Sequence, residues 1–334
     1  MKILSITNNY GYIEDGIGYY SKRIVDEIKK DNIDFEILTD KTVGFSKAKR
    51  ILSLRMAKCF SKAKKRIKEE KIDKIIIEYP FVEENPIIMS KIKSLHRKCK
   101  KNNVELILSL HEYLRVAKLK RFYIRSICKH VDKVMVTDEN NLNALVKYNK
   151  NIFIRHIPVG IIWDFDNDYK KQSNKFVYFG LINKAKAFNE MIDAWKDFNK
   201  DKSFFLEILT ASKIDDIDDD TIKIFKGLSD EEIASHMSDA AYSILPIKPE
   251  IYLNNSSFLT SAQAGCVCIG IFSDRISNNS FMVNLNSYDK DEFVNGLKKA
   301  IDLLGKQSFD EAQKFGSSFT MKNVAKEIEE IIKK

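Results

Sequence analysis

The chain has 334 residues, of which 44% are hydrophobic and 31% are charged, and its formal net charge is +9. This length favours two domains over a single core, and the lack of any apolar run of about 18–20 residues argues against a membrane-spanning helix. The opening segment MKILSITNNY is typical of a buried first strand rather than of a signal peptide. Five cysteines without a zinc-like spacing indicate buried thiols in a reduced, cytoplasmic protein.

The two halves of the chain differ in charge. Residues 1–155 hold 34 lysines and arginines against 19 acidic residues, whereas residues 156–334 hold 22 against 28. Such an asymmetry suggests that the first half faces an anionic partner, either a membrane surface or a nucleic acid. The segment YLRVAKLKRFYIRSICKH mixes apolar and basic residues at helical spacing, as interfacial helices do. A solvated, lysine-rich surface is the alternative explanation.

Short apolar runs alternate with amphipathic stretches along most of the chain. In the first half, strands are predicted over 1–7, 35–39, 74–79, 105–111, 133–137 and 153–159, and helices over 19–31 and 83–102. In the second half, strands are predicted over 176–180, 204–210, 221–225, 241–246 and 266–272, and helices over 191–200, 229–239 and 256–264. The polar stretch WDFDNDYKKQSNK separates the two series.

Alternating strands and helices predict an α/β fold with two Rossmann-like, doubly wound parallel-sheet domains that face a cleft. The polar stretch places the domain boundary near residues 164–174. We therefore expect a basic N-terminal domain over 1–165 and a second domain over 172–317. A C-terminal helix over 318–334 is expected to pack back toward the N-terminal domain.

Ligands of such sheets bind at the carboxyl ends of the strands, so residues that directly follow strands are the candidates for a site. After the first strand comes NNYGYIEDGIGYYSKRI, in which Gly16 and Gly18 lie too late for a dinucleotide fingerprint. Ser21 occupies the third glycine position, which argues against NAD. A longer glycine loop that leads into a helix can still present backbone amides to a phosphate.

A second polar cluster lies in EIYLNNSSFLTSAQAG, between two predicted strands of the second half. Asn254, Asn255, Ser256 and Ser257 are all favoured helix N-cap residues, and four exceed what one cap requires. Small polar side chains at a helix N-terminus also suit an anion. The two interpretations are a plain capped helix and a phosphate site, and the second is preferred.

Taken in order, several segments resemble those of the GT-B fold retaining glycosyltransferases of family 4, which use nucleotide-sugar donors. The resemblance covers nearly the whole chain. The segments are MKILSITNNYGYIEDGIGYYSKRI, ELILSLHEY, DKVMVTDENNLNAL, IRHIPVGI, FVYFGLINKAKAFNEMIDAW and GLSDEEIASHMSDAAYSILP. It implies a donor domain in the second half and an acceptor-side domain in the first.

The resemblance also implies where the donor diphosphate lies. In the family, a glycine–arginine pair ends the first strand of the donor domain, and a lysine follows. Here Gly180 matches, Leu181 replaces the arginine, and the lysine falls on Lys186, with Lys184 as an additional donor-binding candidate. A fixed cation at this position stabilises the charge that grows on the leaving diphosphate.

A second departure from the family concerns two glutamates that usually flank the donor. Their positions fall on Tyr252 and Thr260, and Glu250 lies two residues from the first. Since the second glutamate holds the donor ribose in the family, we expect the ribose contacts to differ here. The polar helix start at Asn254–Ser257 remains for the phosphates.

In the first domain, the resemblance gives His111 a role in binding and orienting the donor sugar, and Glu78 and Glu112 are acceptor-side candidates. The two D-x-D motifs, at Asp164 and Asp216, do not directly follow core strands. We therefore expect neither a catalytic metal nor another cofactor.

These features predict a retaining glycosyltransferase, with a UDP-sugar favoured as donor and a glycan or lipid-linked saccharide as acceptor in cell-surface polysaccharide or glycoconjugate synthesis. The protein is expected in the cytoplasm, with an anionic inner membrane surface as the candidate partner of the basic domain and no nucleic acid. A sugar-nucleotide epimerase of the same fold is one alternative, although it needs acid–base carboxylates. A non-catalytic basic protein that binds membrane or nucleic acid is the other.

Overall fold

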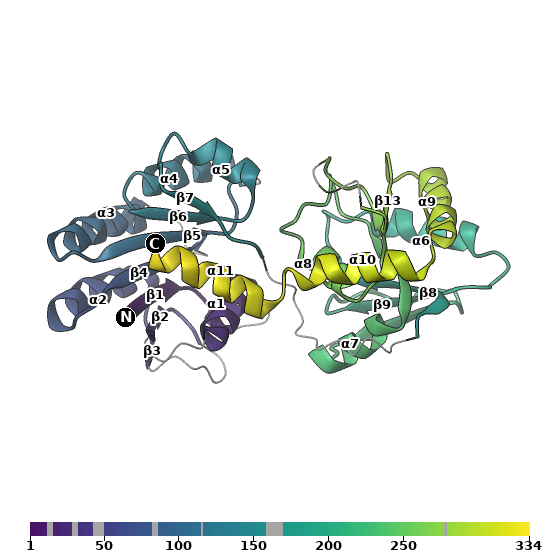
Figure 1. Ribbon diagram of the computed structural model, residues 1–334, viewed down its shortest axis with the longest axis horizontal. Helices are drawn as coiled ribbons and strands as arrows, with labels where there is room; N and C mark the ends of the chain where they lie inside the picture. Colours follow the sequence, from purple (N-terminus) through teal and green to yellow (C-terminus); the bar gives the residue numbers. More distant parts are fainter. Residues whose placement is uncertain are drawn as a thin grey trace. The chain divides into compact units, whose positions relative to one another are not determined.

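The computed structural model describes residues 1–11, 16–28, 33–42, 50–81, 86–114, 116–157, 170–274, 276 and 279–334. The chain forms two compact units, Met1–His156 with Met321–Lys334, and Ile157–Thr320. Most of the boundary predicted at 164–174 lies outside the described residues. The C-terminal helix belongs to the first unit, where it lies beside the first helix of the chain (Figure 1).

The described part of the first unit contains a parallel sheet of seven strands in the order β3-β2-β1-β4-β5-β6-β7. Its strands are β1 (Lys2–Thr7), β2 (Asp34–Thr39), β3 (Arg50–Ser53), β4 (Lys74–Tyr79), β5 (Glu105–Leu110), β6 (Lys133–Val136) and β7 (Ile152–Ile154). Its helices are α1 (Gly16–Glu27), α2 (Met56–Glu69), α3 (Pro86–Lys101), α4 (Lys118–Cys128), α5 (Glu139–Leu145) and α11 (Met321–Lys333).

The described part of the second unit contains a parallel sheet of six strands in the order β10-β9-β8-β11-β12-β13. Its strands are β8 (Gln172–Phe179), β9 (Phe205–Thr210), β10 (Ile222–Lys226), β11 (Ala240–Leu245), β12 (Val267–Gly270) and β13 (Met282–Asn284). Its helices are α6 (Phe188–Phe198), α7 (Asp230–Ser238), α8 (Ser256–Gln263), α9 (Lys290–Asp302) and α10 (Lys306–Ser317).

The predicted fold class, two doubly wound parallel sheets, is confirmed. Strands buried on both faces read as nearly continuous apolar runs, and alternate residues go to opposite faces. In β4, Ile75 and Ile77 pack with α2 and α3 residues, whereas Ile76 packs with residues of α1 and α11. The sequence patterns missed β3 and β13, which have four and three residues and do not lie within a longer apolar run.

The amino ends of both sheets are tied by buried ion pairs between neighbouring strands. In the first sheet, Lys133 Nζ lies 2.7 Å from Glu105 Oε1. In the second sheet, Lys175 Nζ lies 2.8 Å from Glu207 Oε2 and 2.7 Å from Asp239 Oδ1. The charges of these two lysines are therefore compensated within the described residues.

All five cysteines are free and buried, as predicted. Burial raises the pKa of Cys59, Cys99 and Cys128 to about 12, so these thiols stay protonated. Among the described residues, no helix is both long enough and apolar enough to cross a lipid bilayer.

Candidate functional site

Both sheets reverse their strand order at one point, and ligands of open parallel sheets bind outside the carboxyl ends of the strands at such a point. In the first sheet the reversal falls between β1 and β4, and in the second between β8 and β11. Several of the predicted site residues lie near these two places, and the second sheet carries those predicted to bind the diphosphate.

At the end of β8, Gly180 brings the first strand of the second unit into contact with the start of α8. Its φ is +139°, a conformation that side chains with a Cβ rarely adopt. A Cβ on Gly180 would also lie 2.8 Å from Ser257 Oγ. Tertiary packing thus joins two predicted site residues that are 77 positions apart in the sequence.

The start of α8 is a capped helix N-terminus. Asn255 is its N-cap, and its Oδ1 accepts a hydrogen bond of 2.9 Å from the amide of Phe258. Ser256 is exposed and Ser257 is half-buried at the first turn. Capping therefore accounts for Asn255, and of the two serines Ser257 lies beside Gly180.

Lys186 lies near the same switch point, next to the end of β11. Its backbone pairs with Ile247, directly after β11, and the side chain is half-buried. Burial lowers the pKa of its ammonium to about 8. Within the part of the chain that the structure describes, no acidic side chain forms an ion pair with it. Lys184, by contrast, is exposed.

Two other candidates from the sequence occupy different positions. The Tyr252 hydroxyl donates a hydrogen bond to the Glu250 carboxylate, so these two side chains form a pair at the loop before α8. Thr260 has no exposed surface. The second turn of α8 packs its side chain into the core, and its assignment as a donor contact stays a prediction. Leu181, at the position of the family's arginine, is 58% exposed.

In the first unit, Gly18 is a packing glycine. A Cβ there would lie 2.0 Å from the Asn9 carbonyl oxygen, and the Gly18 carbonyl accepts a hydrogen bond of 2.9 Å from the amide of Gly11. The start of α1 can approach the loop after β1 only because this residue has no side chain. Gly16 is the first residue of α1, and residues 12–15 of the glycine loop lie outside the described residues.

His111 directly follows β5 and lies in a buried polar cluster. Its Nε2 is 2.9 Å from Glu78 Oε2 and 3.1 Å from Arg155 Nη2. Arg155 Nε donates a hydrogen bond of 3.1 Å to Ser109 Oγ. The Tyr20 ring meets the His111 imidazole edge-on, with 4.9 Å between the two ring centres. The Arg155 guanidinium lies 4.6 Å from the centre of the Tyr20 ring.

The charges within this cluster compensate one another. Burial alone would raise the pKa of Glu78, but the hydrogen bond from His111, the charges of His111 and Arg155 and a hydrogen bond from Ser109 hold it below its ordinary value. Glu78 is therefore a buried carboxylate. Burial also raises the pKa of the Tyr20 hydroxyl, despite the nearby Arg155 cation. Glu112, the other acceptor-side candidate, is exposed next to this cluster.

The sequence did not single out Arg155, Tyr20 or Ser109. Arg155 was hidden among the many basic residues of the first half, although its place one residue after β7 could have drawn attention to it. It is fully buried.

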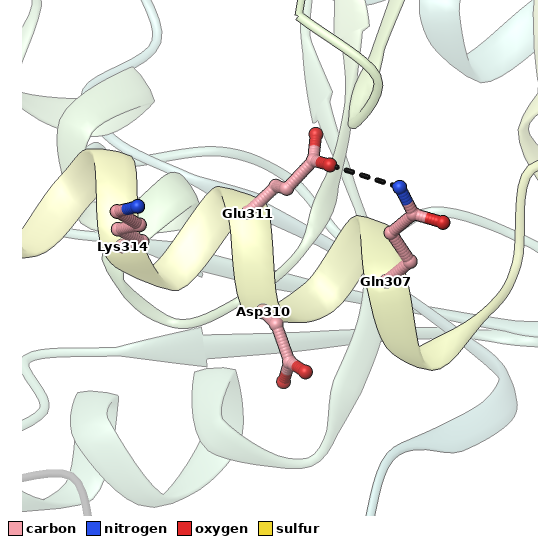
Figure 2. A pocket seen from close by; sticks show the side chains of 4 residues that line it. All are labelled: Gln307, Asp310, Glu311 and Lys314. Atoms are coloured by element: carbon pink, nitrogen blue, oxygen red, sulfur yellow. Dashed lines mark hydrogen bonds between the residues drawn. The ribbon is translucent and has the colours of Figure 1, made fainter.

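Two further features lie away from the strand ends that carry these residues. Asp216 and Asp218 are exposed in the loop between β9 and β10, and the motif at Asp164 lies outside the described residues. A shallow hollow lies along α10, lined by Gln307, Asp310, Glu311 and Lys314 (Figure 2). Its lining comes from one surface helix and contains none of the predicted site residues.

The two units, with these strand orders, define the GT-B fold of glycosyltransferases. A glycosyltransferase from Rickettsia africae is similar over 99% of this chain and 97% of that chain, with 12% identity and a TM-score of 0.71. Anabaena HepE in complex with UDP matches over 100% of both chains, with 11% identity and a TM-score of 0.71.

An alpha-glucosyltransferase in complex with UDP-glucose and DNA also matches over 100% of both chains, with 15% identity and a TM-score of 0.69. No protein-family model matches the chain, and no curated protein matches its sequence. These likenesses define the fold alone.

Proposed function

We propose that this protein is a retaining glycosyltransferase that transfers a sugar from a UDP-sugar to a glycan or lipid-linked saccharide. The main observation behind this proposal is the environment of Lys186. Its half-buried ammonium forms no ion pair within the described residues, and it lies at the switch point of the second sheet. A buried cation without an anionic partner is costly. A bound diphosphate would supply the missing charge.

The surroundings of Lys186 suit the same ligand. Gly180 lets the end of β8 approach the first turn of α8, where Ser256 and Ser257 offer hydroxyls and the helix N-terminus offers a positive dipole end. In the transfer, the bond between the sugar C1 and the β-phosphate oxygen breaks while a bond from C1 to the acceptor oxygen forms. The acceptor proton passes to the leaving diphosphate, whose added charge Lys186 stabilises.

Two of the similar structures hold UDP or UDP-glucose, which supports uridine as the donor base. His111 is proposed to orient the donor sugar from the end of β5. We further propose that the transfer needs no metal, because Lys186 already supplies a cation at the diphosphate and the described D-x-D motif lies in an exposed loop. Full activity in EDTA is expected, and its loss would contradict this point.

The acceptor is proposed to be lipid-linked, in cell-surface polysaccharide or glycoconjugate synthesis, and presented at an anionic membrane surface. On α4, Leu119 and Phe122 are 66% and 64% exposed, three residues apart on one helix face. The same helix carries four basic residues and no acidic one, among them the exposed Lys118. Apolar tips among basic residues fit a lipid surface better than a nucleic acid backbone.

The donor site is tested by thermal unfolding of the full chain with a panel of nucleotides. A ligand at about 100 times its Kd adds about 2.7 kcal/mol to the free energy of unfolding. We expect UDP to raise the Tm and UMP to raise it far less. Replacing Ser256 and Ser257 with valine should abolish the shift, whereas Ser235→Val, on the exposed face of α7, should leave it unchanged. No shift with any nucleoside diphosphate would refute the proposal.

The membrane surface is tested by flotation with vesicles that contain about 30% anionic lipid, at low and high salt. The wild-type chain should float at low salt, and a Leu119→Ser, Phe122→Ser double variant should not. Leu303→Ser removes a 40% exposed apolar residue from the second unit and serves as the matched control. Binding to a DNA duplex without flotation would favour a nucleic-acid acceptor instead.

A further inference from the structure

The C-terminal helix α11 is fastened to the chain after β7 by one carboxylate. Glu327 of α11 accepts a hydrogen bond of 2.9 Å from the backbone amide of His156, and its two oxygens lie 3.0 and 3.1 Å from His156 Nδ1. Burial raises the pKa of Glu327, but the hydrogen bonds from His156 and the charges of His156 and Arg155 hold it below its ordinary value. Glu327 is therefore ionised at neutral pH, and hydrogen bonds to a carboxylate are stronger than those between neutral groups.

The place of this contact matters because β7 is short and lies at the edge of its sheet. It has three residues and pairs with β6 alone among the described strands. Directly after β7, the Arg155 amide donates a hydrogen bond of 2.8 Å to the carbonyl of Val136, the last residue of β6. The next amide, that of His156, donates to Glu327 instead. Glu327 therefore holds the chain at the point where the sheet no longer does.

The residue before His156 belongs to the cluster around His111. Arg155 Nη2 lies 3.1 Å from His111 Nε2, and Arg155 Nε donates a hydrogen bond of 3.1 Å to Ser109 Oγ. The Arg155 side chain is fully buried, so its guanidinium has little room to compensate for a displaced backbone. A shift of the chain at Arg155 and His156 would therefore move the guanidinium away from His111.

α11 also lies next to the same cluster. A cavity of about 20 Å³, room for about one water molecule, has both elements in its lining. Tyr20 and Glu78 line it from the cluster, and Ile328 and Ile332 line it from α11. Both isoleucines are buried and pack with residues of α1 and of the sheet. Glu327, the neighbour of Ile328, thus joins the cluster to a helix that is already packed beside it.

We propose that Glu327 is a positioning residue of the transfer reaction: from α11 it holds the chain at His156 and thereby seats Arg155 against His111. The seating of Arg155 depends on contacts of the first unit alone. Its effect on turnover rests on the proposed transferase function, in which His111 orients the donor sugar. A misplacement of about 1 Å at such a group can lower a rate by about 100-fold, so a residue that acts only through its neighbours can still affect kcat.

The seating of Arg155 is tested by nitrogen NMR on the full chain labelled with ¹⁵N-histidine, because the His111 ring nitrogens sense the nearby guanidinium. A His111→Gln variant identifies the His111 signals among the five histidines. Glu327→Ala should shift these signals. Glu330→Ala is the matched control, since it removes an exposed glutamate from the same helix, and it should leave them unchanged. Unchanged His111 signals in Glu327→Ala would overturn the proposal.

Turnover then separates positioning from a general loss of stability. Glu327→Ala should lower kcat by about tenfold, with a smaller change in the KM for the donor, because orientation matters most as the sugar reacts. Glu327→Gln, whose amide oxygen can still accept from the His156 amide, should restore most of the loss. Val324→Ala removes methyl groups from the buried face of α11 and should lower the Tm while kcat stays nearly unchanged. An equal loss of kcat in Val324→Ala would contradict a specific role of Glu327.

A double variant tests whether Glu327 acts through Arg155. Arg155→Lys already loses the planar fork that meets His111 and Ser109, so adding Glu327→Ala should lower kcat little further. If the two losses multiply instead, Glu327 acts elsewhere and the positioning role is wrong. A wild-type chain without transferase activity would refute the proposed function, while the NMR result would still decide whether Glu327 seats Arg155.

Discussion

The two sheets share one strand order and similar ion pairs at their amino ends, yet their carboxyl edges differ in charge. In the first unit, Glu78, His111 and Arg155 form a buried cluster in which opposite charges compensate one another. In the second unit, Lys186 is half-buried, has a lowered pKa and forms no ion pair within the described residues. The charged groups of the first cluster therefore compensate one another, whereas the second edge is suited to receive an anion. Similar topology therefore does not imply a similar site.

The largest effect is expected from removing the cation of the Glu78–His111–Arg155 cluster in the first unit. Arg155→Met leaves Glu78 and His111 without their buried cation and should lower the free energy of unfolding of the first unit by about 3–5 kcal/mol. Urea unfolding, followed by hydrogen exchange of the β5 amides, measures this loss. Arg97→Met, at an exposed position on α3, should change it by less than about 0.5 kcal/mol. Equal effects of the two variants would show that the cluster contributes little to stability.

Removing the Lys186 ammonium at the carboxyl edge of the second sheet should instead lower turnover and leave the fold intact. Lys186→Ala should lower kcat by about 100- to 1000-fold, because the leaving diphosphate loses its stabilising cation. Steady-state transfer assays of the variant measure kcat, and circular dichroism shows whether the fold is retained. Lys184→Ala, two residues away and exposed, should retain nearly full activity. Near-normal turnover of Lys186→Ala would remove this lysine from the site.

The pH dependence of UDP binding sharpens the comparison further. The unligated Lys186 loses its proton near pH 8, since burial has lowered its pKa, whereas a bound diphosphate favours the charged form. Binding above pH 8 must therefore take up a proton, and the affinity should fall by about tenfold per pH unit. Below pH 8 the lysine is charged in both states and contributes no slope. Calorimetry at pH 7, 8 and 9 measures this, and Lys186→Met should show no such slope.

The smallest effect is expected from adding a positive charge at the carboxyl edge of the second sheet. Leu181 stands where the similar family has an arginine, and its side chain is 58% exposed beside Gly180. Leu181→Arg should tighten UDP binding by about fivefold, because an ion pair at an exposed position contributes about 1 kcal/mol or less. Weaker binding by this variant would place the diphosphate elsewhere. Leu303→Arg, in the same unit but on α9's end, serves as the control for net charge.

The sequence alone determined the class of fold, because alternating apolar runs and amphipathic stretches are local patterns that strands and helices impose on their own residues. It also placed Gly180, Lys186 and Ser257 near strand ends, where ligands of parallel sheets bind. Two short strands, β3 and β13, were missed: three or four residues do not establish a period, and a strand of similar length such as β12 was predicted because it lies within a longer apolar run.

Only the tertiary structure decided which of these residues meet and what state they are in. The approach of Gly180 to Ser257, the burial of Thr260 and the joining of Glu78, His111 and Arg155 depend on packing between segments that are distant in the chain. Hydrogen bonds and neighbouring charges hold Glu78 ionised against the effect of its burial, whereas burial lowers the pKa of Lys186. Those two quantities are properties of the folded surroundings, and therefore no pattern in the sequence could show them.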